Sequence, residues 1–205
     1  MNKATLDARL DLLSKLQDAF DSTPQAFINL TQNLNSHDVA MIGTVIQVYC
    51  YADFNARRII DVLKHTAMGA PRSASRLQDA QVFPMLEHIV REHLWDGDLK
   101  DGLLKAAATV EMHRVHRHNF AHWSARRVKG ANALVMFTMN AREAERRDGV
   151  APEPTEAKYG ILSLDGFDEE VRKLQEHTNY LARQAAHLEQ HVEELKAEFT
   201  RRRGA

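Results

Sequence analysis

The chain has 205 residues, of which 44% are hydrophobic and 27% are charged, a composition that excludes a wholly disordered protein. The 27 lysines and arginines nearly balance the 28 aspartates and glutamates, so the net charge of −1 does not indicate nucleic-acid binding and any basic site must be local. The one cysteine, Cys50, excludes an internal disulfide, and no apolar run approaches the ~20 residues of a membrane span, so we expect a cytoplasmic protein without a membrane partner.

The N-terminal part of the chain has the hydrophobic spacing of amphipathic helices. Apolar residues recur at steps of three and four over residues 6–20, and a short helix is predicted over residues 24–34, with a proline at its first position. Residues 35–38 then offer a cap for a longer helix, whose apolar stripe runs over residues 39–63.

One member of that longer stripe is not apolar. Asp53 stands where a core residue is expected, and a buried carboxylate is costly unless it is paired. We therefore expect Asp53 to meet an arginine or a histidine, unless it lies at the solvated edge of the stripe.

Two further helices are predicted in the middle of the chain. Residues 74–94 have helical spacing, although Pro84 should end or kink the first part of that helix. A turn over residues 95–98 separates it from a helix that we expect to run without a break over residues 99–121.

The pattern changes after Trp123. Residues 133–139 are short, apolar and partly β-branched, which fits either a strand or a short buried helix. Residues 146–157 are polar and contain two prolines, so they are predicted to form a loop. Residues 159–164 are a second candidate strand, which would pair with the first as a small β-hairpin.

The C-terminal residues carry a heptad seam, defined by ten residues with four-three spacing: Phe167, Val171, Leu174, Thr178, Leu181, Ala185, Leu188, Val192, Leu195 and Phe199. A helix of this length would extend on the order of 50 Å, more than the diameter of a small domain. Either one end overhangs or docks on another subunit, or the helix lies along its own bundle.

These patterns together predict a mainly α fold with a small β-hairpin and a long C-terminal heptad helix. We assign residues 1–130 to a helical bundle, residues 131–164 to the hairpin and its connections, and residues 165–205 to the long helix, as a dimerisation element.

A basic, histidine-rich stretch carries the strongest chemical signal. No acidic residue occurs from Met112 to Arg142, and cationic and imidazole side chains concentrate there: His113, Arg114, His116, Arg117, His118, His122, Arg126, Arg127 and Lys129. Such a patch attracts phosphate, and arginine forks hold phosphate oxygens in a fixed geometry. We therefore expect RNA as a partner, with Arg126, Arg127 and Lys129 as RNA-binding residues.

Three interpretations of this stretch compete. A metal site is disfavoured because the companion glutamate of an H-E-x-x-H motif is missing and the arginines would repel a cation, so we expect no metal and no other cofactor. The second pair of histidines four apart, His187 and His191, fits an exposed face of the last helix. The histidines of the basic stretch could also be merely solvated at a helix end. The third interpretation is phosphodiester chemistry.

Arg117 and His122, with four residues between them, suit metal-free cleavage of RNA. Histidine titrates near neutrality and can take the 2′-hydroxyl proton, while arginine stays charged and can stabilise the crowded phosphorane. Five helical residues turn through ~500°, so the two side chains are only roughly co-facial. A kink, or a second copy of the chain, would help them converge.

The run Arg117-His118-Asn119-Phe120-Ala121-His122, late in a helix of an all-α domain, resembles the motif of the HEPN superfamily. That motif is an arginine, four to six residues beginning with a polar one, and a histidine, with a small residue before the histidine, here Ala121. A preceding long helix with an acidic residue, here Asp53, is also similar. The resemblance covers about residues 36–125.

The resemblance implies a bundle of four to five helices that dimerises with the two motifs facing each other. Many members are metal-independent ribonucleases of toxin–antitoxin or anti-phage systems, which implies a homodimer, an RNA substrate and an antitoxin protein as a partner. Arg117 and His122 would be catalytic. The supporting residues would be His118, Asn119, Arg114 and Asp53, the last orienting Arg117 or Arg114.

Two positions depart from the family pattern. His118 occupies the first motif position, which is usually Asn or Asp, and Ser124 stands where one subtype, paired with a nucleotidyltransferase antitoxin, carries a tyrosine. Some members of the superfamily are non-catalytic. The alternative function is therefore a non-catalytic module that binds RNA or nucleotide, or that assembles through the heptad seam.

Overall fold

The computed structural model describes residues 3–22, 28–71, 73–95, 97–140, 142, 145 and 158–203. The chain forms two compact units, each built from two separate stretches. The helical unit contains Thr44–Arg117 and Glu170–Ala205, and the sheet unit contains Met1–Gly43 and His118–Glu169.

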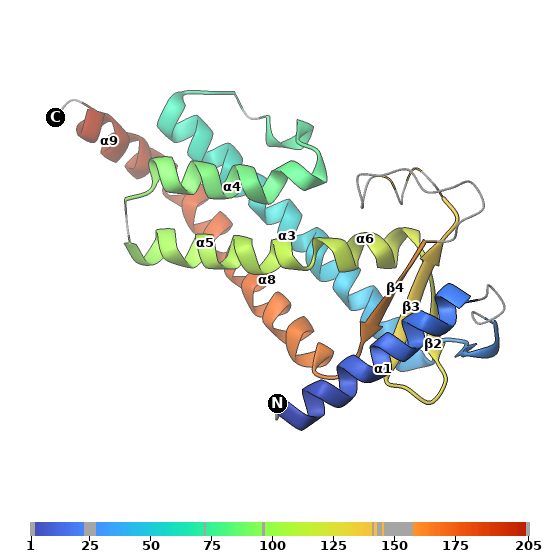
Figure 1. Ribbon diagram of the computed structural model, residues 1–205. Coiled ribbons are helices and arrows are strands. Elements are labelled where there is room, and N and C mark those ends of the chain that lie inside the picture. The colour runs from blue at the N-terminus through green and yellow to red at the C-terminus, as the bar shows by residue number, and fades with distance from the viewer. Residues whose placement is uncertain are drawn as a thin grey trace. The chain divides into compact units, whose positions relative to one another are not determined.

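The helical unit takes most of its residues from five α-helices: α3 (Ser36–Met68), α4 (Asp79–His93), α5 (Gly97–Met112), α8 (Phe167–Gln190) and α9 (Val192–Arg203). A 3₁₀ turn, η1 (Ala74–Arg76), lies between α3 and α4. Helices α4 and α5 run side by side (Figure 1). The core is fully buried and aliphatic, with one aromatic pair in which Tyr49 meets Phe83 edge-on at 5.7 Å between ring centroids.

The sheet unit contains α1 (Lys3–Ser22) and a four-stranded antiparallel sheet in the order β1 (Thr31–Gln32), β2 (Ser124–Val128), β3 (Ala133–Thr138) and β4 (Lys158–Ser163). Leu16 and Phe20 of α1 pack in one cluster with Val128, Ala133 and Val135 of the sheet. The apolar side of α1 therefore covers the sheet, as its spacing of three and four allows.

The mainly α class and the small β-hairpin are confirmed. Residues 133–138 form a strand rather than a buried helix, and that strand pairs antiparallel with β4. The predicted cap of α3 is also present, because the Asn35 side chain accepts a hydrogen bond from the Asp38 backbone N–H at 2.9 Å and the Asp38 carboxylate accepts one from the Asn35 N–H at 3.0 Å. None of the described helices is long and apolar enough to cross a membrane.

Three details of the prediction are wrong. The helix expected over residues 99–121 is interrupted at His113, where α5 ends and α6 (Arg114–His122) begins. The helix expected over residues 24–34 is instead a strand at Thr31–Gln32, because Thr31 pairs with Val128 of β2; residues 23–27 lie outside the described part of the chain. Pro84 does not end its helix, since α4 continues through it.

The long C-terminal helix is divided at His191 into α8 and α9. Most of the heptad seam is buried within a single copy of the chain: Phe167, Leu174, Thr178, Leu181, Ala185, Leu188 and Phe199. In α9, Phe199 packs edge-on against Trp95 with ring centroids 4.7 Å apart. These seven side chains are therefore not available to a second chain without unpacking the fold.

Candidate functional site

The candidate site is centred on α6, which turns one side to the core and another to solvent. Asn119 and Phe120 are buried, whereas Val115, Ala121 and His122 are exposed. At about 100° per residue, the five steps from Arg117 to His122 leave these side chains about 140° apart around the helix axis. The small Ala121 lies on the arc between them.

Arg117 is held by α3 and α4 within the helical unit. Its Nη1 lies 3.6 Å from Oδ2 of Asp79, and its Nη2 lies 3.9 Å from Sγ of Cys50. The guanidinium also lies over the Tyr49 ring, 5.9 Å from the centroid. With 22% of its side chain exposed, Arg117 is fixed in place while its charge remains within reach of a ligand.

Asp53 is paired with an arginine, as its place in the apolar stripe predicts, but the partner is Arg57. Arg57 Nε donates to Oδ2 of Asp53 at 2.7 Å, and Arg57 Nη2 lies 3.4 Å from Oδ1 of Asp79. Asp79 therefore lies between two guanidinium groups. The acidic neighbour of Arg117 is Asp79, and sequence reasoning missed it because α4 is remote from the motif along the chain.

Arg114 donates from Nε to Oε1 of Glu111 at 2.6 Å, so it is committed to the end of α5. Glu111 also raises the pKa of the Tyr49 hydroxyl, although burial is the larger cause. Among the described residues, the Tyr49 hydroxyl, Glu111 Oε2 and Arg117 Nε are buried without a hydrogen-bond partner. Such groups are rare in folded proteins and concentrate where a ligand or a partner completes the site.

Two of the four histidines in the basic stretch are not available as cations at neutral pH. His113 is 4% exposed, and burial lowers its pKa. Burial also lowers the pKa of His116, whose ring centroid lies 5.9 Å from that of His113. Their imidazoles belong to the interior, and neither ring nitrogen of His113 has a hydrogen-bond partner in the described part of the chain.

His122, in contrast, is exposed in the sheet unit at the end of α6. Its ring centroid lies 4.8 Å from that of His118, which is half-buried. The helix end is anchored by Phe120, which meets Phe167 edge-on at 6.4 Å. Asn119 is buried with its Oδ1 unpartnered among the described residues, so its side chain supports the interior of the motif rather than its surface.

The three expected RNA-binding cations each donate to an acceptor within the sheet unit. Arg126 donates to Thr31 Oγ1 at 2.9 Å and to Asn33 Oδ1 at 3.1 Å. Arg127 Nη1 lies 2.5 Å from Oδ1 of the buried Asp38, and Lys129 donates to a backbone carbonyl at 2.8 Å. Strand β2, absent from the predicted elements, positions these cations against the fold, which reduces the charge that they offer to a polyanion.

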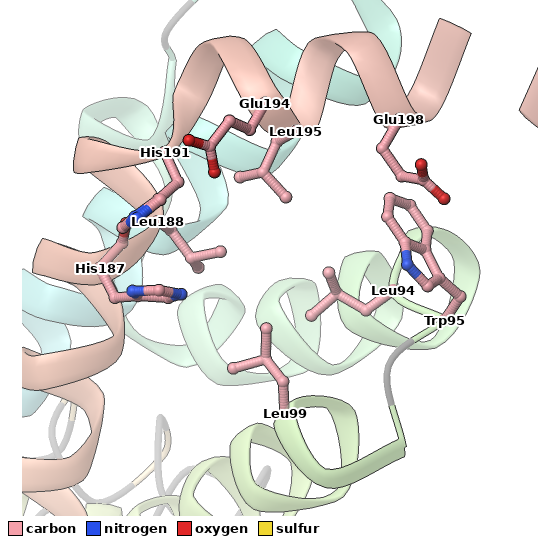
Figure 2. Close-up of a pocket in the computed structure, with 9 residues that line it drawn as sticks. All are labelled: Leu94, Trp95, Leu99, His187, Leu188, His191, Glu194, Leu195 and Glu198. Carbon is pink, nitrogen blue, oxygen red and sulfur yellow. The ribbon is translucent and has the colours of Figure 1, made fainter. Parts of the chain in front are cut away.

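A pocket of about 550 Å³ lies in the helical unit, away from these contacts, and Figure 2 shows its lining: Leu94, Trp95, Leu99, His187, Leu188, His191, Glu194, Leu195 and Glu198. The rings of His187 and His191 are 4.3 Å apart, and Nδ1 of His191 lies 2.8 Å from the His187 carbonyl oxygen. No group of three or more His, Cys, Asp or Glu side chains suited to a metal ion occurs within the described ranges. The pocket thus combines an apolar floor with imidazole and carboxylate groups at its edge.

Comparisons with protein-family models, with curated proteins and with solved structures find no match for this chain. Function is therefore inferred from the residues and their contacts alone.

Proposed function

We propose that the protein is a metal-independent endoribonuclease of the HEPN type that acts as a homodimer through α6. The observation that carries this proposal is the pairing, on one short helix, of a positioned guanidinium and an exposed imidazole. Arg117 is oriented by Asp79 and by the Tyr49 ring, while His122 reaches solvent. Metal-free RNA cleavage needs these two groups.

In this mechanism His122 takes the proton of the 2′-hydroxyl, and the 2′-oxygen attacks the adjacent phosphorus. The bond between phosphorus and the 5′-oxygen breaks, and a protonated histidine returns a proton to that oxygen. Arg117 stabilises the additional negative charge on the equatorial oxygens as the phosphorane forms. The products are a 2′,3′-cyclic phosphate and a 5′-hydroxyl.

A second copy of the chain explains how the two groups meet. They lie about 140° apart on α6, so one helix alone directs them away from each other. Two copies related by a two-fold axis would bring Arg117 of one towards His122 of the other, and the methyl group of Ala121 allows the helices to approach closely. A role as a toxin or anti-phage component, with an antitoxin as partner, extends this proposal through the family resemblance.

Asp79 sets the condition for substrate binding. Its side chain is 61% exposed and lies 3.6 Å from Arg117, a distance at which an exposed ion pair contributes little stability. A phosphodiester can therefore displace it and form a fork with the guanidinium. Arg57 keeps Asp79 nearby in the absence of RNA.

The test is cleavage of single-stranded RNA by the purified full-length protein in the presence of EDTA. His122→Ala should lower the cleavage rate by about 10²–10⁴-fold, the usual contribution of a general acid or base, and Arg117→Ala should also abolish turnover. His187→Ala, an exposed histidine of α8, is the matched control and should leave the rate unchanged. Circular dichroism melts verify that each variant is folded.

Mixing the two inactive variants tests the homodimer. A mixed dimer retains one Arg117 and one His122, so part of the activity should return when Arg117→Ala and His122→Ala proteins are combined. Full activity of His122→Ala would contradict the proposal. RNA binding without cleavage by the unmodified protein would instead favour the non-catalytic RNA-binding module.

A further inference from the structure

We infer that Tyr51 and Phe54 form a stacking platform for the bases of single-stranded RNA beside the motif. This inference rests on the proposed RNA substrate, and it assigns the part of the molecule that holds the bases rather than the phosphate. Neither residue belongs to the motif or to the basic stretch.

The platform consists of two nearly parallel rings that face solvent. The ring centroids of Tyr51 and Phe54 are 6.5 Å apart and the ring planes differ by 13°. Tyr51 is 48% exposed and Phe54 is 56% exposed. Aromatic side chains of this size are usually buried, and an exposed flat pair is the form that proteins use to stack unpaired bases.

Arg58 adds a flat cationic surface to the platform. Its Cζ lies 5.5 Å from the centroid of the Phe54 ring. The guanidinium is fixed from three sides, since Nε and Nη2 donate to Glu189 at 3.0 and 2.5 Å and Nη1 donates to Asn55 at 2.7 Å. Arginine planes stack on bases as aromatic rings do, and a guanidinium that is already immobilised loses little entropy when a base binds.

The platform adjoins the residue that would hold the phosphate. Cys50, which contacts Arg117 at 3.9 Å, directly precedes Tyr51 and is one helical turn before Phe54. Residues four apart lie on the same side of a helix. An RNA strand whose phosphate contacts Arg117 can therefore place a neighbouring base against the Phe54 ring.

The extent of the apolar surface favours RNA over a second protein chain. Along the exposed side of α3 the two rings are bordered by the polar Gln47 and by the ion-paired Arg58. A stable protein interface covers about 800 Å² on each partner, and two side chains supply only a fraction of that. Stacking on single bases needs no larger surface than a ring.

The experiment measures the affinity for a 2′-O-methyl RNA of about ten nucleotides, a length within the usual site sizes, by fluorescence anisotropy. Tyr51→Ala and Phe54→Ala should each raise Kd roughly 10-fold, within the range for the loss of one stacked base. Phe54→Leu should also weaken binding although it stays apolar, whereas Phe54→Tyr should bind normally. Met68→Ala, an exposed apolar residue at the end of α3, is the matched control.

The probe cannot be cleaved, so loss of binding is distinguished from loss of catalysis. Platform variants that lose affinity support the inference whether or not the unmodified protein cuts RNA. Equal affinity of Phe54→Ala and the unmodified protein, or no RNA binding by either, would overturn it. Dissociation of a dimer by Phe54→Ala in analytical ultracentrifugation, with RNA affinity unchanged, would assign the platform to a protein interface and would also overturn it.

Discussion

Asp38 is a buried acid whose charge is fully compensated by one arginine and one backbone group. Its side chain is 0% exposed, Arg127 lies 2.5 Å from its Oδ1, and the Asn35 N–H donates to its Oδ2. A buried carboxylate left without its cation is strongly destabilising. Arg127 is therefore needed for folding of the sheet unit, whatever else it binds.

Replacing this arginine should reveal that role. Arg127→Ala should lower the free energy of unfolding by about 3 kcal/mol, because it leaves the Asp38 carboxylate buried without a cation. Arg126→Ala, on the same strand but bonded to neutral acceptors, should cost only about 1 kcal/mol. Urea denaturation measures both, and Asp38→Asn in the Arg127→Ala background should recover part of the loss. Equal effects of the two arginine variants would contradict this assignment.

At this scale the sequence predicts residue types well and their partners poorly. The place of Asp53 in an apolar stripe correctly predicted an arginine partner, but Arg57 rather than Arg117 or Arg114 fills that position. The four histidines of the basic stretch look equivalent along the chain, yet His113 is buried and His122 is exposed. Burial depends on which elements pack together, and local spacing does not specify that.

Helices α5 and α8 are fixed against each other by a glycine that accommodates an aromatic side chain. A Cβ atom at Gly102 would lie 2.6 Å from Cζ of Tyr180, too close for any real contact. Gly43, in α3, has open space in the same position and no positive φ. The two glycines therefore have opposite roles in helices of the same fold.

Gly102→Ala should destabilise the protein by about 1–3 kcal/mol, because the helices must shift or Tyr180 must leave its rotamer. Gly43→Ala should instead stabilise it by about 1 kcal/mol through helix propensity alone. Thermal and urea unfolding of the two variants give the comparison. Tyr180→Ala should relieve the Gly102→Ala defect, and additive losses in that double variant would show that the steric explanation is wrong.

Elements with strong periodicity were predicted, and elements that depend on a distant partner were not. The apolar stripe gave α3, and apolar β-branched residues gave β3. Strand β2 has the sequence Ser-Ala-Arg-Arg-Val, whose period does not mark a strand, and it is a strand because it pairs with β3. The break at His113 likewise interrupts a continuous apolar pattern, which contains no glycine or proline to indicate it.

Buried histidines link the stability of the whole molecule to pH. Burial lowers the pKa of His113, His116 and His177 below the 6.5 of an exposed imidazole, while Glu170 partly opposes the shift at His113 and Glu176 at His177. Below about pH 6.5 the unfolded chain binds protons that the folded chain refuses. The free energy of unfolding should therefore be fully present above that pH and decrease as the pH falls.

This decrease is measurable by urea denaturation between about pH 7.5 and 5.5, a window that spans the ordinary histidine pKa. His113→Leu should flatten the dependence because it removes one refused proton. His187→Ala, which changes an exposed imidazole, should leave the slope as it is. A stability that rises on acidification would contradict the assignment of these histidines to the interior.

At the scale of the whole molecule, composition and periodicity were sufficient for the mainly α class but not for the division into units. We divided the chain in order, at residues 130 and 164. The compact units instead combine stretches that are far apart along the chain. Such a return of the chain leaves no local signal, because it is decided by which hydrophobic surfaces pack together.

The contact between Cys50 and Arg117 has a practical consequence. Cys50 is the sole cysteine and its thiol is exposed, so a maleimide dye or nitroxide attaches at one position without any prior mutagenesis. The attached probe would sit beside the guanidinium, where arrival of a polyanion changes its surroundings. In an assembly of two labelled copies, electron–electron dipolar coupling would give the separation of the two motifs directly.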